Sequence, residues 1–297
     1  MYADLAADTR VRAGDVPGRY HLTMPTNWDY VLPSGGVVMT CALRAAEAHL
    51  AEPPLRLASA TSIFASPIHP GELVADVHVI RRGRGATQVR VTLEHVKGGA
   101  NDDAGGVEML ATFVRDRRGP DVKGVAMPAW AKSLADATPV EDASEKNPHT
   151  RFRFYHQYDC KLADGEPFWL PDFTEGPARY ARWLRYRVPQ RDADGNLDRL
   201  ALPPIIDTMP TALHRAIGPG AYRFYAPSLD LTTYTVDDTK REWLLVAVTM
   251  RRARGGWAIA DAEVWDDEGR FIAYGAQAMY LHNLSGEPPT LDASRRP

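Results

Sequence analysis

The most regular pattern in the chain is the alternation of apolar and polar positions on either side of two basic runs. Residues 81–85 read Arg-Arg-Gly-Arg-Gly, and residues 251–255, which follow 170 positions later, read Arg-Arg-Ala-Arg-Gly. Before and after each run, apolar residues occupy every second position, as they do in half-buried strands. Each run is therefore predicted to form the turn of a long antiparallel hairpin.

Elements upstream of the two hairpins fall into the same register. The segment 35–50 is apolar almost all round, which is typical of a helix that is wrapped on most sides. At the same offset it falls on 205–220, which overlaps a second helix predicted over 200–217, where Pro210 should break or delay the helix. Because one register aligns a helix as well as strands, the sequence predicts an internal duplication.

The predicted elements divide the chain into two similar halves. The first half has a helix over 36–50 and strands over 18–26, 57–66, 72–81, 86–96 and 107–116. The second half has a helix over 200–217 and strands over 179–188, 225–235, 241–251, 256–265 and 270–281. We expect an N-terminal repeat over 1–116, a linker over 117–164, a C-terminal repeat over 165–283 and a tail over 284–297. The proline-rich linker should wrap the surface, with one short helix near 129–136.

These halves predict an α+β fold. A long apolar helix laid on the concave face of an antiparallel sheet is the hotdog arrangement. Two such units pair edge to edge, which removes an exposed sheet edge from each. The sequence therefore predicts a tandem, or double, hotdog fold, in which each half is an antiparallel sheet wrapped around a central helix.

Composition narrows the classes of function. The chain has 297 residues, 44% of them hydrophobic and 25% charged, which is ordinary for a soluble globular protein. A net charge of −3 argues against nucleic acid as a partner. No apolar run is long enough for a membrane span, and the N-terminal residues lack the apolar stretch of a secretory signal.

Cysteine and histidine spacing argues against metal or disulfide chemistry. Cys41 and Cys160 lie far apart, which fits a reducing cytoplasm, and Cys41 is interpreted as a small buried hydrophobe rather than a reactive thiol. The nine histidines show no metal-binding spacing. We expect a cytoplasmic protein without metal or cofactor.

A family resemblance rests on short motifs that occur in a fixed order in both halves. They are Trp28, Pro33-Ser34-Gly35-Gly36, Phe64 to Pro67, Pro70-Gly71 and Arg82-Gly83-Arg84, then Trp183-Leu184-Arg185, Asp207, Pro227-Ser228-Leu229-Asp230, Glu242-Trp243-Leu244, Trp265-Asp266 to Gly269 and Ala276-Gln277-Ala278. On these motifs the chain resembles bacterial acyl-CoA thioesterase II and its thioesterase-like, double-hotdog relatives. The resemblance covers roughly residues 18–116 and 165–281.

The resemblance implies an active site in which an Asp, a hydroxyl residue and a Gln hold a water against a thioester carbonyl. These roles fall on Asp207, Ser228 and Gln277. The segment between Asp207 and Ser228 is shorter here than in the family, so Thr232 and Thr233 are substitutes for the hydroxyl residue and further substrate-binding candidates. Gly35 and Gly36, at the start of the first helix, are candidates to bind the substrate oxygen through backbone amides.

Simpler interpretations stay open for the same residues. Asp207 can be the N-cap of the helix that follows it, and Ser228 can be a turn hydroxyl. The basic turns are solvated hairpin tips or contacts for CoA phosphates. At the repeat offset, Val37 and Ala58 stand where Asp207 and Ser228 stand, which predicts one site per chain, in the second half.

The sequence thus predicts an acyl-CoA thioesterase, with acyl-CoA as its substrate and further association into a homo-oligomer, a dimer of double hotdogs. One alternative is an acyl-thioester binding protein without turnover, because a fold does not determine a function. Another is a hotdog hydratase or dehydratase. Asn147-Pro148-His149 is similar to part of that motif, but it lies in the polar linker and not before a buried helix.

Overall fold

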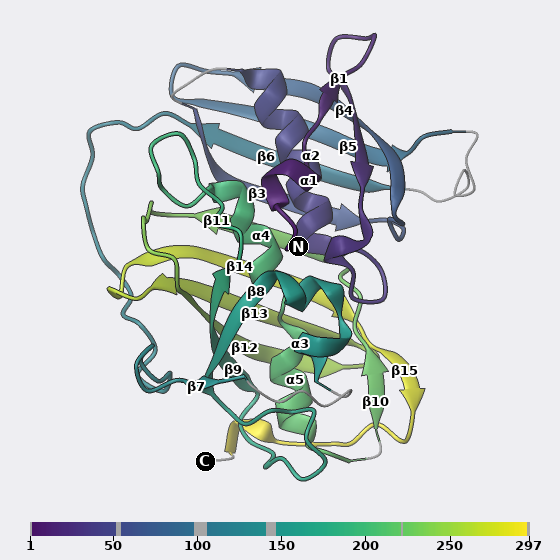
Figure 1. Ribbon diagram of the computed structural model, residues 1–297, viewed down its shortest axis with the longest axis vertical. Helices are drawn as coiled ribbons and strands as arrows, with labels where there is room; N and C mark the ends of the chain where they lie inside the picture. The colour runs from purple at the N-terminus through teal and green to yellow at the C-terminus, as the bar shows by residue number, and fades with distance from the viewer. Residues whose placement is uncertain (1, 52–54, 98–105, 141–146, 221, 296–297) are drawn as a thin grey trace.

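One antiparallel sheet with thirteen strands runs through the described part of the molecule, which is a computed structural model covering residues 2–51, 55–97, 106–140, 147–220 and 222–295 (Figure 1). From edge to edge the strands are β1 (Arg12–Ala13), β2 (Arg19–Met24), β4 (Gly71–Arg82), β5 (Ala86–His95), β6 (Val107–Val114), β3 (Arg56–Phe64), β11 (Asp230–Thr235), β14 (Phe271–Tyr280), β13 (Trp257–Asp266), β12 (Leu244–Arg254), β9 (Arg179–Tyr186), β8 (Tyr158–Asp164) and β7 (Thr138–Pro139). A small second sheet pairs β10 (Arg223–Tyr225) with β15 (His282–Ser285).

Helices occupy one side of the large sheet. They are α1 (Leu5–Asp8), α2 (Gly35–Leu50), α3 (Pro148–Arg151), α4 (Leu202–Ile206) and α5 (Pro210–Ile217), with short 3-10 turns η1 (Thr26–Trp28), η2 (Arg153–Gln157), η3 (Arg199–Ala201) and η4 (Ala293–Arg295). In Figure 1, α2 crosses the strands of the N-terminal half, and α4 and α5 lie over the C-terminal half.

The two halves join edge to edge at β3 and β11. These strands pair antiparallel, with Thr61 opposite Thr232 and Asp230 opposite Ile63. On either side of this seam the strand order is mirrored, so that β6, β5, β4 and β2 correspond to β14, β13, β12 and β9. The predicted tandem hotdog fold is confirmed.

Both predicted hairpins are present: β4 pairs with β5, and β12 pairs with β13. Three of the five residues of the first basic run, 83–85, lie between β4 and β5 as predicted, whereas four of the five residues of the second run belong to the end of β12. In the second hairpin the turn itself is Gly255-Gly256, with φ of 62° and 83°. Two consecutive positive φ angles suit a tight hairpin turn whose twist matches that of its strands, and glycine adopts them without steric cost.

Helix α2 lies in the core of the N-terminal half, as its almost wholly apolar sequence predicts. It packs against β4, β5 and β6, and its apolar residues from Val37 to Ala46 are buried. Cys41 on this helix is fully buried, and burial raises the pKa of its thiol to about 12. The interpretation of Cys41 as a small hydrophobe is therefore confirmed, because a thiol with this pKa is not a thiolate at neutral pH.

The second helix is broken where its proline predicts a break. Helix α4 ends at Ile206, and α5 begins at Pro210. A proline has no amide proton to donate to residue 206, and its ring clashes with the carbonyl of that residue in a continuous helix. Asp207 is the first residue after α4, so the break places its side chain beyond the end of that helix, in contact with the elements packed around it.

The segment between the halves is more structured than predicted. It contains β7, α3, η2 and the seven-residue strand β8, which pairs with β9. The helix predicted near 129–136 is absent, because these residues form turns. Instead, Met127, Trp130 and Leu134 pack with Trp183 and Trp265 on the outer face of the C-terminal sheet. Residues 141–146 of the predicted linker and 296–297 of the predicted tail lie outside the described residues, and β15 extends to Ser285.

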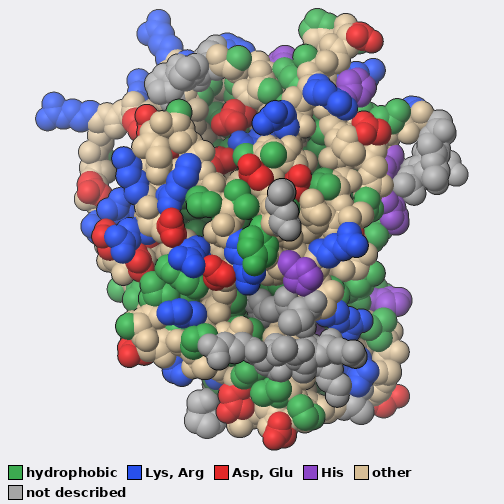
Figure 2. All heavy atoms as spheres, viewed as in Figure 1, with side chains coloured by type: hydrophobic (Ala, Val, Ile, Leu, Met, Phe, Trp, Pro, Cys, Tyr) green, Lys and Arg blue, Asp and Glu red, His purple; other side chains and the backbone are tan. Residues whose placement is uncertain are grey.

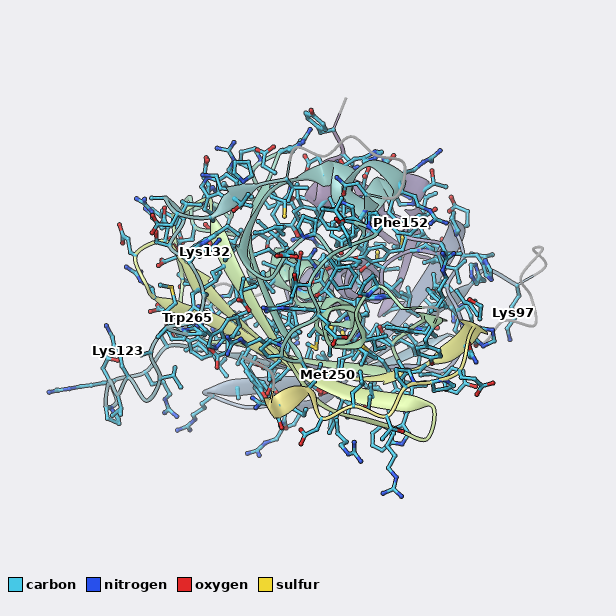
Figure 3. All side chains as sticks on the ribbon, turned by 90° about the horizontal axis from the view of Figure 1, so that it is seen from below. Lys97, Lys123, Lys132, Phe152, Met250 and Trp265 are labelled. Atoms are coloured by element: carbon cyan, nitrogen blue, oxygen red, sulfur yellow. The ribbon has the colours of Figure 1, made fainter. Side chains whose placement is uncertain are left out.

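The surface shows charges of both signs. Acidic and basic side chains are interspersed over the face in Figure 2. In Figure 3, Lys97 and Lys123 stand at the periphery, whereas Phe152 lies among packed side chains. No helix in the described part of the chain is both long and apolar enough to cross a membrane.

Candidate active site

The carboxylate of Asp207 joins the two repeats at the start of α2. Its Oδ2 atom accepts a hydrogen bond of 2.9 Å from the Ser34 hydroxyl and one of 2.8 Å from the Gly36 amide. The first amides of a helix have no partner within the helix, and the helix N-terminus favours a negative charge. Asp207 thus satisfies an amide of a helix in the other half of the chain.

This arrangement corrects the expectation that Asp207 caps the helix that follows it. The residue before α5 is Met209, and it makes no side-chain capping hydrogen bond. Ser34 precedes α2 and also makes no such bond, because its hydroxyl donates to Asp207 instead. Asp207 therefore takes the capping position of α2, not that of its own helix.

The second oxygen of Asp207 meets the other two predicted residues. Ser228 donates a hydrogen bond of 3.1 Å to Oδ1, and the Gln277 amide nitrogen donates one of 2.5 Å. The same nitrogen lies 2.5 Å from the Ser228 hydroxyl. The Oε1 atom of Gln277 is buried and accepts no hydrogen bond from the described residues. The structure therefore brings Asp207, Ser228 and Gln277 together in one triangle.

Strand pairing explains how residues far apart in the sequence meet. Ser228 forms a bridge with Met279 of β14, two residues from Gln277 on the same strand. Gly275, also on β14, allows α4 to approach, since a Cβ atom there would lie 2.3 Å from Cγ2 of Ile206. The close approach of α4 to β14 brings Asp207 to Gln277.

Burial dominates the electrostatics of this carboxylate. Burial raises the pKa of Asp207, and the hydrogen bonds from the Gly36 amide, Ser34, Gln277 and Ser228 lower it without cancelling that rise. A carboxylate removed from water binds a proton more readily than an exposed one. Asp207 is thus a stronger base than an ordinary aspartate, although four donors hold it in place.

Gly35 and Gly36 lie where the two helices touch. A Cβ atom on Gly36 would lie 2.4 Å from the Pro203 carbonyl oxygen, and one on Gly35 would lie 3.0 Å from the Phe64 ring. Backbone atoms of α4 thus pass directly over the start of α2. Gly35 also lines a cavity beside Asp207, whereas the Gly36 amide donates its hydrogen bond to Asp207.

Thr232 and Thr233 lie apart from this triangle. The Thr232 hydroxyl shares a hydrogen bond of 2.9 Å with Thr61. Its neighbours in β11, Leu231 and Thr233, are buried on the helix side, so the alternation of the strand points Thr232 to the outer face. Thr233 faces inward, but it does not line the cavity. Of the three candidate hydroxyl residues, Ser228 is the one in contact with Asp207.

A cavity of about 510 Å³ opens beside the carboxylate. Asp207, Ser228 and Gly35 line one part of it. The rest of its wall is largely aromatic, with Tyr30, Phe64, Phe152, Tyr155, Phe168, His214, Phe224, Tyr225 and Tyr280. Pro148, Phe152 and Tyr155 belong to the segment predicted to wrap the surface, and that prediction is wrong for them.

Several residues of this wall were not found from the sequence. His214 lies between the rings of Phe168 and Phe224, at centroid distances of 5.1 and 4.3 Å, and burial lowers its pKa to about 4. It follows Asp207 by seven positions, but the helix break between Ile206 and Pro210 separates them, so helical spacing does not place both on one face. Tyr155 shows no such spacing either, because it lies in a short 3-10 turn.

No group of side chains in the described ranges has the composition of a metal site. The polar groups of the triangle are one carboxylate, one hydroxyl and one amide, and hydrogen bonds join all three. What this arrangement offers is a base of raised pKa, flanked by hydrogen-bond donors and open to an apolar cavity.

Comparison with known proteins identifies the family of the chain. Models of the N-terminal and C-terminal domains of acyl-CoA thioesterases match residues 24–115 and 133–281. The chain belongs to the acyl-CoA thioesterase family. No curated protein matches the chain.

Several solved structures share the fold of this chain. An acyl-CoA thioesterase II from Mycobacterium marinum is 19% identical, with a TM-score of 0.71 over 96% of this chain and 100% of its own. A putative thioesterase II from Thermobifida fusca is 20% identical, with a TM-score of 0.73 over 94% of this chain and 98% of its own. A protein of unknown function with a hot dog fold from Alicyclobacillus acidocaldarius is 18% identical, with a TM-score of 0.76 over 96% of this chain and 98% of its own.

Proposed function

We propose that this chain hydrolyses an acyl-CoA thioester to a free acid and CoA, at one site built around Asp207. The observation that carries the proposal is the buried carboxylate of raised pKa at the wall of a largely apolar cavity. A hydrolase of this kind needs a base, a bound water and donors for the oxygen that gains charge. Each has a candidate among the residues in contact here.

In the proposed reaction, water attacks the thioester carbonyl and Asp207 takes one of its protons. The carbonyl carbon gains a bond to the water oxygen and then loses its bond to sulfur. The CoA thiolate leaves and takes up the proton held by Asp207, so that one water is consumed and one acid and one thiol are formed. No cofactor enters this balance.

Ser228 and Gln277 have the geometry to hold that water. Ser228 donates to Oδ1 of Asp207, is partly exposed and lines the cavity. A water from the cavity therefore reaches Asp207 by displacing the Ser228 hydroxyl. The unpartnered Oε1 atom of Gln277 can accept the second proton of the same water. A buried carbonyl oxygen without a partner is costly, and a bound water removes that cost.

The start of α2 supplies candidate N–H donors for the oxyanion, the thioester oxygen that gains charge. Gly35 is the first residue of α2 and lines the cavity, and the first amides of a helix point their N–H groups outward along the axis. A developing negative charge is stabilised at such a terminus. We infer that the thioester oxygen binds near Gly35 and that the N-terminal half contributes this part of the site.

The proposal is tested with a panel of acyl-CoA thioesters that differ in chain length and polarity. Purified protein should release free CoA thiol from at least one of them, as measured with a chromogenic thiol reagent. Binding of acyl-CoA without thiol release from any member would instead identify the chain as an acyl-thioester binding protein.

Ser228→Ala should lower kcat/KM by about 10- to 100-fold, because it removes a donor that positions the base and its water. Thr232→Ala is the matched control, since the Thr232 hydroxyl bonds to Thr61 on the outer face. Its kcat/KM should stay within about twofold of the wild type, as expected for a residue away from the chemistry. Equal losses in both variants would argue against Ser228 as the hydroxyl partner.

Activity should fall on the acidic side with a midpoint above the pKa of about 3.9 of an ordinary aspartate, because burial raises the pKa of Asp207. The base must be deprotonated, so kcat/KM rises with pH through this midpoint. Ser34→Ala removes a hydrogen bond that lowers the pKa and should move the midpoint to higher pH. The measurement is kcat/KM against pH for both proteins; a midpoint that Ser34→Ala leaves unchanged would exclude Asp207 as the titrating base.

Two further expectations stay predictions. The outer face around the seam carries the exposed apolar residues Ile63, Leu110 and Tyr234, which supports association into a dimer of double hotdogs. A cytoplasmic location remains the expectation drawn from the two cysteines.

A further inference from the structure

Strand β9 carries an arginine that faces the core. Arg182 is 2% exposed and lies on the same side of the strand as Tyr180, Leu184 and Tyr186, which belong to the core beneath the helices. A guanidinium cannot lose its proton in a protein, so Arg182 brings a full positive charge into the interior.

The charge of Arg182 has no carboxylate partner among the described residues. Its Nη1 atom donates one hydrogen bond of 3.1 Å to the Tyr155 hydroxyl, and its guanidinium lies 5.1 Å from the Tyr155 ring centroid. Its Nη2 atom and the hydroxyl of Tyr180 are buried and have no hydrogen-bond partner within the part of the chain that the structure describes. Arg199, also buried, is different, because it forms an ion pair of 2.6 Å with Asp238.

An unpaired buried charge is unfavourable for folding. Apolar replacements of buried charges are often neutral or stabilising, whereas a buried charge without a partner strongly destabilises the folded state. The aromatic contacts of Arg182 offset part of this cost and leave Nη2 unsatisfied. A ligand with an anionic group would supply the partner that Arg182 lacks among the described residues.

The guanidinium lies directly behind the wall of the cavity. Tyr155, which it contacts, lines the cavity together with Tyr30. Tyr30 lies near both charges: burial raises its pKa, the charge of Asp207 adds to that rise and the charge of Arg182 opposes it. One cavity thus has a carboxylate at the proposed reaction centre and, behind Tyr155 at another part of its wall, a cation without a carboxylate partner among the described residues.

We propose that the acyl group taken by this cavity ends in a carboxylate, which Tyr155 and Arg182 bind. The substrate class is then the CoA monothioester of a dicarboxylic acid rather than of a simple fatty acid. A guanidinium matches a carboxylate with two parallel hydrogen bonds, and the unsatisfied Nη2 supplies one of them. This inference rests on the proposed hydrolysis at Asp207 and specifies its substrate.

The first test compares thioesters that differ at the far end of the acyl chain alone. The pairs are succinyl- and butyryl-CoA, glutaryl- and valeryl-CoA, adipyl- and hexanoyl-CoA, and suberyl- and octanoyl-CoA. In at least one pair, kcat/KM for the carboxylated member should exceed that of its partner by about 10- to 100-fold, the usual effect of a charge-assisted hydrogen bond. Equal or faster hydrolysis of the uncharged member in every pair would overturn the inference.

Arg182→Met keeps the volume of the side chain and removes its charge. It should abolish or reverse the preference within the pair, while hydrolysis of the uncharged member is kept or increased. Arg199→Met is the matched control, and it should lower stability but leave the preference unchanged. A misfolded variant loses both rates together, so an altered ratio cannot arise from misfolding. An unaltered ratio in Arg182→Met would contradict the proposal.

A binding measurement separates this inference from the proposed function. Free adipate or suberate should raise the Tm of the wild type more than hexanoate or octanoate does, and Arg182→Met should lose that difference. Absence of thiol release from every thioester, together with this Tm pattern, would refute the hydrolase and keep the carboxylate site. Thiol release without any Tm difference or pair preference would support the hydrolase and refute the carboxylate site.

Discussion

Asp207→Asn should lower kcat/KM for thioester hydrolysis by at least about 100-fold, the lower range for the loss of a general base. The fold should survive. The asparagine carbonyl can still accept from Ser34 and Gly36, and the amide of Gln277 can rotate to present its unpartnered Oε1 to the new NH2 group. Removing a buried charge also removes its desolvation cost. The measurements are kcat/KM by thiol release and Tm by thermal denaturation.

Asp261→Asn is the matched control, because Asp261 forms an ion pair with Arg251 and does not line the cavity. Its activity should match that of the wild type. Asp207→Ala is less informative, since it leaves four donors without an acceptor and should destabilise the protein by about 1–3 kcal/mol for each buried donor that water cannot reach. Near wild-type activity in a folded Asp207→Asn would show that Asp207 only caps α2.

Gly36→Ala should lower the free energy of unfolding by about 3 kcal/mol, the upper range for overpacking a core. Within a helix, replacing glycine with alanine usually stabilises by about 0.5–1 kcal/mol. Here the new methyl group would lie 2.4 Å from the Pro203 carbonyl oxygen and 2.6 Å from Cα of Pro204, and backbone atoms cannot rotate away. The two helices must separate, which also weakens the hydrogen bond from the Gly36 amide to Asp207.

Denaturant unfolding measures this effect, and the activity of the folded fraction reports the loss at Asp207. Gly119→Ala is the control, because no atom of the described residues lies within 4 Å of the Cβ position there. It should leave both stability and activity unchanged. A Gly36→Ala protein as stable and as active as Gly119→Ala would mean that α2 and α4 do not need this close approach.

The periodic features of the sequence predict the fold well, because they record burial directly. Alternation identifies the strands on both sides of the basic runs, the apolar length of α2 identifies a wrapped helix, and Pro210 identifies the break before α5. Strand β8 does not follow from the sequence because it lies next to the two-residue edge strand β7, and its three buried residues do not alternate with exposed ones. Without that alternation its sequence pattern is weak.

The candidate site is predicted less completely, because its contacts join distant parts of the chain. Asp207, Ser228 and Gln277 follow from family resemblance, and the structure places them in contact. The hydrogen bond from Gly36 to Asp207 links residues 171 positions apart, and no local pattern reveals it. Arg182 could have been noticed, because the alternation of β9 places it among Tyr180, Leu184 and Tyr186 on the apolar face.

The most direct test of the central claim is a single-turnover hydrolysis in water labelled with oxygen-18, with enzyme in excess over the thioester. If Asp207 activates water, the acid released in the first turnover carries the label, the thiol appears in equal amount, and the peptide that contains Asp207 stays unlabelled. If Asp207 instead attacks the carbonyl itself, it forms a mixed anhydride, and water attack on the aspartyl carbon of that anhydride puts the label into the Asp207 peptide and leaves the first acid unlabelled. That second result, or the absence of any released thiol, would contradict the account.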